Sequence, residues 1–138
     1  QASPFGPGTV GQGLLTPTRL YVKPALAAIR AGGVHGLAHI TGGGLTENLP
    51  RVLPDGLGAT INLGAWTLPP VFAWLARTAG MDRAELLKTF NCGIGMIAVV
   101  TADRAEAVAD LMRGMGEKVT PLGHVVPEQA AAYIGQLA

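Results

Sequence analysis

Apolar residues recur along the chain at two spacings, one typical of helices and one typical of strands. Where they return every three or four positions we expect amphipathic helices, and where they alternate or form a short continuous run we expect strands. The segments expected to be helices are 23–31, 45–52, 69–79, 83–89 and 103–112. The segments expected to be strands are 36–41, 57–63, 94–100 and 119–126. The last residues, 127–138, are expected to form a small terminal helix.

Glycine and proline dominate residues 1–17, which we therefore interpret as a loop or linker. The remaining residues, 18–138, are expected to form a single domain, because a chain of 138 residues rarely contains two independent cores. The predicted strands and helices do not alternate strictly one to one. We therefore predict the α+β class, as a layered sandwich of one mixed sheet with about four strands and helices packed on it. A doubly wound α/β sheet is the alternative.

Charged residues make up only 14% of the chain, against roughly 25% in an ordinary soluble domain, while hydrophobic residues make up 49%. Such a composition indicates either a membrane protein or a domain that another polypeptide partly covers. A membrane protein is disfavoured, because no window contains the roughly 18 apolar residues that a spanning helix needs. Segments 1–18 and 52–76 carry only one charged side chain, Asp55, and are therefore expected to face a missing neighbour or partner.

The balance of 10 basic and 9 acidic residues predicts no nucleic-acid partner, since proteins that bind nucleic acid carry a basic patch. The single cysteine, Cys92, has no second cysteine for a disulfide, and no spacing of cysteine and histidine predicts a zinc site. A reducing, cytoplasmic location fits this composition best. The chain begins at Gln1 without a basic or apolar leader, which predicts no signal peptide and indicates a piece of a longer protein.

The most distinctive motif is the run Thr41-Gly42-Gly43-Gly44, between a predicted strand and a predicted helix. Glycines lack the Cβ that keeps a ligand away from the backbone, so their N–H groups are able to converge on a phosphate. The spacing matches neither a P-loop nor the dinucleotide fingerprint, and a plain tight turn is an equal alternative. If the turn holds a phosphate, replacing Gly43 by valine is expected to abolish turnover and to leave the fold intact.

Four polar residues flank this turn and are candidates for chemistry. Glu47 and Arg51 lie four positions apart. They form either an ordinary surface ion pair or a ligand site, in which Arg51 binds a phosphate and Glu47 binds a metal or moves a proton. Asn48 is a candidate for fixing the orientation of the ligand. His39, at the end of the preceding strand, is either a core histidine or a catalytic residue.

A second polar cluster, Asn91-Cys92-Gly93, precedes the apolar strand expected at 94–100. Cys92 has no activating partner nearby in the sequence, so we interpret it as a buried thiol rather than a nucleophile. Asn91 is the better candidate for a ligand contact, with Gly93 close to it. The polar residues that follow the linker, Arg19, Tyr21 and Lys23, are interpreted as a solvated helix start.

Three runs of sequence resemble one enzyme family, in the same order along the chain. They are LTPTRLYVK at 15–23, AHITGGGLTENLPRVLP at 38–54 and KTFNCG at 88–93. Together they resemble the C-terminal domain of aminoimidazole ribonucleotide synthetase, also called phosphoribosylformylglycinamidine cyclo-ligase. The resemblance extends over about residues 14–126, which is most of the chain.

The resemblance implies an enzyme of purine biosynthesis that uses ATP to activate the formyl amide oxygen of formylglycinamidine ribonucleotide, so that an internal nitrogen closes the imidazole ring. The products would be aminoimidazole ribonucleotide, ADP and phosphate. It also implies an N-terminal domain, absent from this chain, that supplies most of the ATP and magnesium site and the interface of a homodimer. We expect the C-terminal domain alone to bind neither cofactor firmly and to be inactive.

The motifs and the resemblance together define a set of site residues. The residues expected to take part in catalysis are His39, Glu47 and Asn48. The residues expected to bind substrate or phosphate are Thr41, Gly42, Gly43, Gly44, Arg51, Asn91 and Gly93. No residue is expected to bind a metal. Two other classes stay open: a non-catalytic anion-binding or interaction module of the same fold, and another ATP-dependent enzyme of the superfamily, such as a thiamine monophosphate kinase or a selenophosphate synthetase.

Overall fold

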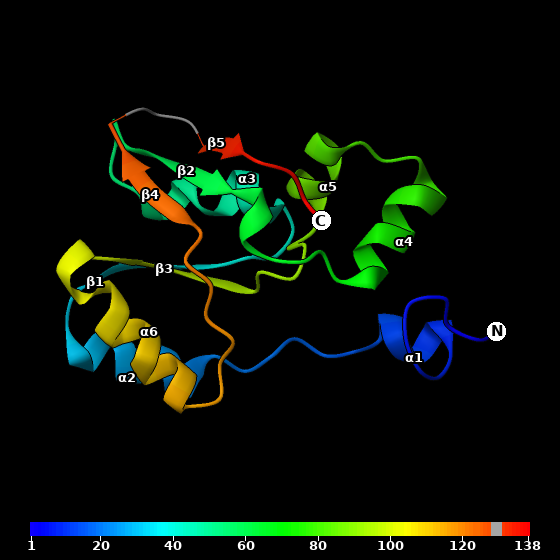
Figure 1. Ribbon diagram of the computed structural model, residues 1–138, viewed down its shortest axis with the longest axis horizontal. Helices are drawn as coiled ribbons and strands as arrows, with labels where there is room; N and C mark the ends of the chain where they lie inside the picture. The colour runs from blue at the N-terminus through cyan, green and yellow to red at the C-terminus, as the bar shows by residue number, and fades with distance from the viewer. Residues whose placement is uncertain (128–130) are drawn as a thin grey trace.

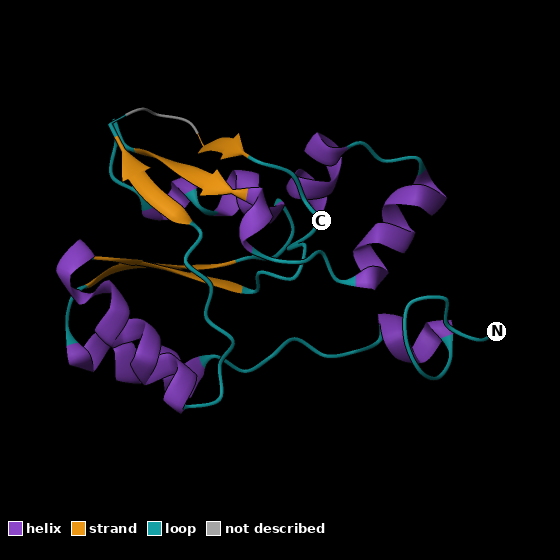
Figure 2. Ribbon diagram, in the orientation of Figure 1, coloured by secondary structure: helices purple, strands orange, loops and turns teal. Residues whose placement is uncertain are grey.

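The computed structural model describes residues 1–127 and 131–138. Its α-helices are α1 (Val10–Leu14), α2 (Val22–Ala31), α3 (Gly44–Asn48), α4 (Pro70–Ala79), α5 (Arg83–Thr89) and α6 (Ala105–Gly114). Its strands are β1 (Val34–His39), β2 (Gly58–Asn62), β3 (Met96–Val100), β4 (Gly123–Val126) and β5 (Ala131–Ile134). Short 3-10 turns are η1 (Pro50–Val52), η2 (Leu63–Ala65) and η3 (Ala102–Arg104). Figure 2 shows how helices and strands are distributed.

The described strands form two sheets. In one, β1 pairs antiparallel with β3, and in the other, β2 lies between antiparallel β4 and parallel β5 (Figure 1). The predicted α+β class is confirmed, but the expectation of one mixed sheet is wrong. The reason is that Ala38 of β1 and Ile61 of β2 are buried in the same core, so the two sheets pack their apolar faces together instead of joining at their edges.

Helices α2 and α6 lie side by side below the β1–β3 pair in Figure 1. Each turns an apolar stripe inward, so that Ala28 of α2 and Val108 and Ala109 of α6 are buried. Gly80 ends α4 and Asp82 caps the start of α5, as the sequence indicates. The carboxylate of Asp82 accepts a hydrogen bond from the backbone N–H of Glu85 at the start of α5, at 2.8 Å.

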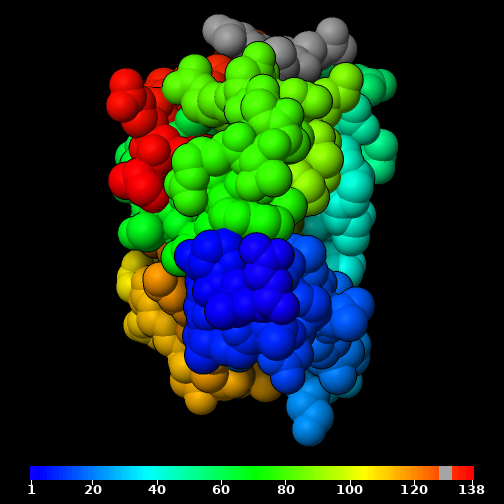
Figure 3. All heavy atoms as spheres, turned by 90° about the vertical axis from the view of Figure 1, so that its right-hand side faces the viewer, coloured from blue at the N-terminus to red at the C-terminus, as the bar shows by residue number. Residues whose placement is uncertain are grey.

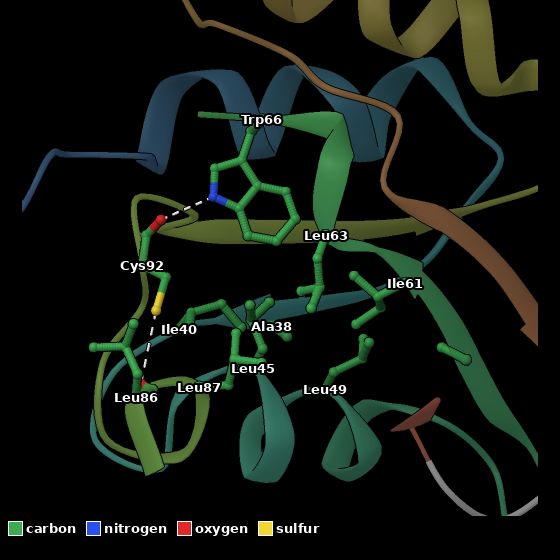
Figure 4. Close-up of a cluster of buried hydrophobic side chains, with 11 residues drawn as sticks. Ala38, Ile40, Leu45, Leu49, Ile61, Leu63, Trp66, Leu86, Leu87 and Cys92 are labelled. Atoms are coloured by element: carbon green, nitrogen blue, oxygen red, sulfur yellow. Dashed lines mark hydrogen bonds between the residues drawn. The ribbon is translucent and has the colours of Figure 1, made fainter. Parts of the chain in front are cut away.

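The core lies between the two sheets and is closed by α3 and α5 (Figure 4). Leu63, the first residue of η2, directly after β2, is completely buried within it. The indole Nε1 of Trp66 donates a hydrogen bond of 2.9 Å to the carbonyl oxygen of Cys92. The Cys92 thiol in turn donates to the carbonyl oxygen of Leu86 at 3.6 Å. The first bond ties the segment after β2 to the segment after α5, which carries one of the candidate site motifs, and the second ties that segment back to α5.

The expected terminal helix at 127–138 is wrong for residues 131–134, and residues 128–130 lie outside the described part of the chain. Residues 131–134 instead form β5, in which Tyr133 pairs with Ile61 in the register of β2. The Tyr133 hydroxyl also forms a hydrogen bond of 2.8 Å with the hydroxyl of Thr46. Pairing with β2 therefore outweighs the local helix preference of an alanine-rich segment.

The interpretation of residues 1–17 as a loop is wrong for α1. Thr9 and Gln12 form a reciprocal capping box at the start of this helix, a signal that the sequence does carry. The ring of Phe5 packs on Trp74 of α4, with 5.1 Å between ring centroids. Figure 3 accordingly shows the N-terminal segment lying against α4. The segment from Leu15 to Tyr21 then crosses to α2 without helix or strand.

The helix predicted at 45–52 is divided into α3 and η1, because Pro50 lacks the N–H that a continuing helix needs. The strands predicted at 94–100 and 119–126 are shorter than expected and begin at Met96 and Gly123. In each case the start of the predicted strand belongs to a loop. Boundaries of this kind depend on pairing partners that the local sequence does not contain.

The charge-poor stretch 52–76 belongs largely to this chain's own core. It contains β2 and Trp66, and four of its apolar side chains are buried. These are Ala59, Ile61, Leu63 and Trp66. The expectation that the whole stretch faces a missing partner is therefore wrong. Its low charge follows from burial within the domain.

No helix among residues 1–127 and 131–138 has the length and hydropathy that crossing a bilayer requires.

Replacing Leu63 by alanine removes a fully buried side chain from between the sheets. We expect the free energy of unfolding, measured by urea denaturation, to fall by about 2–5 kcal/mol. Leu15 is the matched control, because its side chain is 82% exposed. The Leu15→Ala variant should stay within about 0.5 kcal/mol of the original chain. Equal losses in the two variants would contradict this description of the core.

Burial raises the pKa of the Cys92 thiol from its ordinary 9.0 to about 11. The thiol therefore stays protonated at pH 8, and we expect a thiol reagent to label it only after the protein unfolds, as followed by mass spectrometry. The unfolded thiol ionises first as the pH rises. The free energy of unfolding should consequently fall between about pH 9 and pH 11. Rapid labelling of the folded chain would contradict this assignment.

Candidate functional site

The turn Thr41–Gly44 connects β1 to α3 and is closed by a hydrogen bond of 2.9 Å from the Gly44 N–H to the Thr41 carbonyl oxygen. Gly44, the last glycine of the turn, allows the turn to pack closely against α5. Gly44 is buried with a φ of 56°, and a Cβ at this position would collide with the carbonyl oxygen of Leu87 in α5. Any side chain at this position would therefore push the turn and α5 apart.

The other two glycines differ from Gly44 and from each other. Gly43 has a φ of 97°, and a Cβ built on it would lie 2.8 Å from Oε2 of Glu47. Valine at this position would strain the backbone, so a loss of turnover in Gly43→Val would not by itself report on phosphate binding. A Cβ at Gly42, in contrast, would meet nothing within 4 Å among the described residues. Gly42 is thus the glycine whose missing side chain leaves the backbone open to a ligand.

Asn48 organises this turn. Its side chain is almost fully buried, with 8% of the residue exposed. Its Nδ2 donates to the carbonyl oxygens of Gly42 at 3.1 Å and Gly44 at 2.9 Å, and its Oδ1 accepts a bond of 3.2 Å from Nη1 of Arg51. Because both ends of the amide are engaged, Asn48 acts on the shape of the turn. We therefore assign it the role of a positioning residue.

Glu47 lies between two cations on the surface. Its carboxylate oxygens are 3.7 Å from Nη2 of Arg51 and 3.7 Å from Nζ of Lys88. The Glu47–Arg51 ion pair that the sequence offered as one alternative is present. Both cationic side chains are 65% exposed, so solvent screens the pairs and each contributes at most about 1 kcal/mol. The cluster has one surplus positive charge, which leaves it able to attract an anion.

A cleft of about 360 Å³ opens beside the turn, at the end of β1. It is lined by Thr16, Pro17, Thr18, Arg19, Tyr21, His39, Ile40, Thr41, Asn91 and Gly95. The structure thus brings together three of the predicted site residues, His39, Thr41 and Asn91. The cluster around Glu47, Asn48 and Arg51 does not line this cleft and adjoins it only through the glycine turn.

Tyr21 lines the cleft, although the sequence motifs did not identify it as a site residue. Its ring meets the imidazole of His39 edge-on, with 5.9 Å between centroids, and its hydroxyl lies against Gly95. Burial raises the pKa of the phenol above its ordinary 10.0; the Glu117 carboxylate raises it further and Arg19 opposes this. Tyr21 therefore remains a protonated hydrogen-bond donor near neutral pH. Its position in the resembling run 15–23 was the one sequence signal for it.

Asn91 and Gly93 form a tight turn after α5. The Oδ1 of Asn91 accepts a hydrogen bond of 2.9 Å from the Gly93 N–H. Gly93 has a φ of 94°, and a Cβ on it would approach Pro69 at 2.7 Å. Gly93 therefore serves the local packing and is not a wall of the cleft, whereas Asn91 is. A direct contact between Gly93 and a ligand stays a prediction.

The described residues form no dedicated cluster of metal ligands. Among the described residues, no three side chains of the histidine, cysteine, aspartate and glutamate types gather in one place. The carboxylate of Glu47 is also flanked by Arg51 and Lys88, which compete with a cation.

Comparison with solved structures finds the same fold in longer proteins. A chain of a HypE–HypF complex is similar with a TM-score of 0.69 and 19% identity, over 89% of this chain and 43% of that one. HypE from E. coli, a hydrogenase maturation protein, is similar with a TM-score of 0.66 and 20% identity, over 86% of this chain and 37% of its own. This chain spans less than half of either protein.

Thiamine-monophosphate kinase from Stenotrophomonas maltophilia is also similar, with a TM-score of 0.56 and 16% identity, over 80% of this chain and 34% of the kinase. These identities are low enough that the likeness concerns the fold alone. A family model described as the C-terminal domain of AIR synthase related protein, in contrast, matches residues 3–135 of the sequence itself. The chain therefore belongs to the family of C-terminal domains of AIR synthase-related proteins.

Proposed function

We propose that this chain is the C-terminal half of an ATP-dependent cyclo-ligase that converts formylglycinamidine ribonucleotide to aminoimidazole ribonucleotide. One observation carries the proposal. Nine of the ten residues that line the cleft, all except Gly95, lie in the three separate runs that resemble this enzyme family. Runs that are distant in sequence and meet at one cleft are expected where they share one ligand.

In the proposed reaction, the formyl amide oxygen of the substrate attacks the γ-phosphorus of ATP, and ADP leaves. An internal nitrogen then attacks the activated carbon, loses a proton, and closes the ring as the phosphate departs. Phosphoryl transfer depends mainly on positioning and charge neutralisation, so the reaction requires no covalent intermediate with this chain. Magnesium, held by another part of the complete protein, would neutralise charge on the ATP phosphates.

The residues of this chain take separate roles in the proposal. Gly42 allows the phosphate groups to approach the open backbone of the turn. Asn48 maintains the shape of that turn, and Arg51 balances part of the anionic charge. His39, exposed beside the cleft, accepts the proton that the attacking nitrogen releases. Glu47 is proposed to hold Arg51 and Lys88 in place rather than to transfer a proton.

The remaining parts of the site are proposed to come from elsewhere. An N-terminal domain would complete the ATP and magnesium site and form a cytoplasmic homodimer, and this chain alone would not turn over substrate. A non-catalytic anion-binding module and a different ATP-dependent enzyme of the superfamily are the competing functions. The triple-glycine run and the KTFNCG run favour the cyclo-ligase over the other ATP-dependent enzymes.

The first test is the activity of the complete protein encoded by the gene that contains this sequence. Incubated with ATP, magnesium and formylglycinamidine ribonucleotide, it should form aminoimidazole ribonucleotide and ADP in equal amounts, measured by chromatography. The chain of residues 1–138 should form neither. If the complete protein instead phosphorylates thiamine monophosphate, the competing enzyme is correct. ATP binding without turnover of either substrate would favour the module.

The second test uses the open position in the glycine turn. Gly42→Ala adds a methyl group where nothing of the protein lies within 4 Å, so the fold should be unaffected. If phosphate groups approach the backbone there, kcat/KM of the complete protein should fall at least about tenfold. Gly114→Ala is the matched control, because a Cβ at Gly114 also meets nothing within 4 Å. Normal kinetics in Gly42→Ala would refute the role of the turn.

A further inference from the structure

Two hydroxyl groups connect the last strand, β5, to the helix that follows the glycine turn. The phenol hydroxyl of Tyr133 in β5 forms a hydrogen bond of 2.8 Å with the hydroxyl of Thr46 in α3. Thr46 also donates, at 3.4 Å, to the carbonyl oxygen of Leu87 in the last turn of α5. Three elements that are distant in sequence therefore meet at one threonine (Figure 1). None of these three residues was among the predicted site residues.

The number of available hydrogens fixes the direction of the two bonds. A threonine hydroxyl has one hydrogen to donate and two lone pairs that accept. Because Thr46 gives its hydrogen to the Leu87 carbonyl, Tyr133 is the donor in the bond between the two hydroxyls. The bond to Leu87 is long for a hydroxyl donor. It therefore depends on Tyr133, since a donor bound to the Thr46 oxygen polarises that hydroxyl and strengthens its own donation.

The phenol of Tyr133 is in the state that this relay requires. Burial raises the pKa of Tyr133 above its ordinary 10.0, although the hydrogen bond to Thr46 opposes this. The hydroxyl therefore keeps its proton near neutral pH and is able to donate it to Thr46.

The Leu87 carbonyl lies where α5 and the glycine turn come together. Carbonyl groups in the last turn of a helix lack a partner within the helix, so another group has to satisfy them. Thr46 supplies such a group, while a Cβ on Gly44 would collide with the same oxygen. Thr46 and Gly44 lie two positions apart in α3. The hydrogen bond and the close approach therefore act on one contact between α3 and α5.

We propose that Tyr133 is a positioning residue of the site, which acts through Thr46 to fix α3 against α5 and thereby sets the geometry of the glycine turn. The amide of Asn48, in the same helix as Thr46, bonds to the carbonyl oxygens of the turn, so a shift of α3 is passed on to the turn. The effect on turnover rests on the proposed function, in which phosphate groups approach the backbone at Gly42.

The competing explanation is that Tyr133 only fastens β5 to the domain. The backbone of β5 pairs with β2, with Tyr133 opposite Ile61, and the Tyr133 side chain packs against the core. Neither contact requires the hydroxyl. Tyr133→Phe keeps both contacts and removes the donor of the relay. Thr46→Val removes the relay from the side of α3, and Thr46→Ser keeps the hydroxyl.

The first measurement is amide hydrogen exchange of the 138-residue chain, followed by NMR. The Gly44 N–H closes the turn through its bond to the Thr41 carbonyl oxygen, so its exchange rate reports on the turn. We expect this rate to rise about fivefold in Tyr133→Phe and in Thr46→Val, as for the loss of one hydrogen bond. Thr46→Ser should keep the original rate.

Two controls separate this effect from a general loss of stability. The amides of α6 take no part in the relay and should keep their exchange rates, whereas global destabilisation would raise the rates in α6 as well. Thr78→Val removes a hydroxyl from an exposed position of α4 and should leave the Gly44 rate unchanged.

The second measurement is turnover by the complete protein. We expect kcat/KM of the cyclo-ligase reaction to fall about fivefold in Tyr133→Phe and in Thr46→Val. The double variant should lose no more than either single variant, because both substitutions break the same relay. Thr46→Ser should retain the original kcat/KM.

Three outcomes would overturn the inference. They are an unchanged Gly44 exchange rate in Tyr133→Phe, an equal acceleration at Gly44 and in α6, and an unchanged kcat/KM in the Tyr133→Phe variant of an active protein. The exchange measurement is independent of turnover. If the complete protein lacks cyclo-ligase activity but exchange at Gly44 rises selectively, the proposed function fails and the positioning role stands.

Discussion

The arrangement of the site depends on the close approach of the glycine turn to the last turn of α5. Gly44 lies so near the carbonyl oxygen of Leu87 that the structure has no room for a side chain there. This contact brings the end of β1 and the start of α3 beside the segment that follows α5. It therefore places Thr41 and Asn91, which are 50 positions apart, on the wall of one cleft.

Two further interactions keep this approach in place. The buried amide of Asn48 bridges carbonyl oxygens on both sides of the turn, and the indole of Trp66 holds the carbonyl oxygen of Cys92. Each of these hydrogen bonds provides a partner for polar atoms that would otherwise be buried without one. The cleft is consequently bounded by backbone whose shape depends on buried polar contacts, while the charged side chain of Arg19 at its wall is exposed to solvent.

Much of the fold could be predicted from local patterns. The apolar spacing placed α2, α4, α5 and α6 within a few residues, and Asp82 marked the start of α5. The extended segment 15–21, β5 and the division into two sheets were not predictable in the same way. Tyr133 pairs with Ile61, and Arg19 pairs with Glu117, across 72 and 98 positions of sequence. A local window contains neither partner.

The sequence by itself determined the family, the α+β class and the two motifs around Gly42 and Asn91, because these are properties of residue order and local spacing. Only the tertiary structure decided the role of each residue within them. It assigned Gly44 to packing, Asn48 to the shape of the turn and Gly42 to the open backbone. The physical reason is that a role depends on which atoms surround a side chain, and those atoms come from distant parts of the chain.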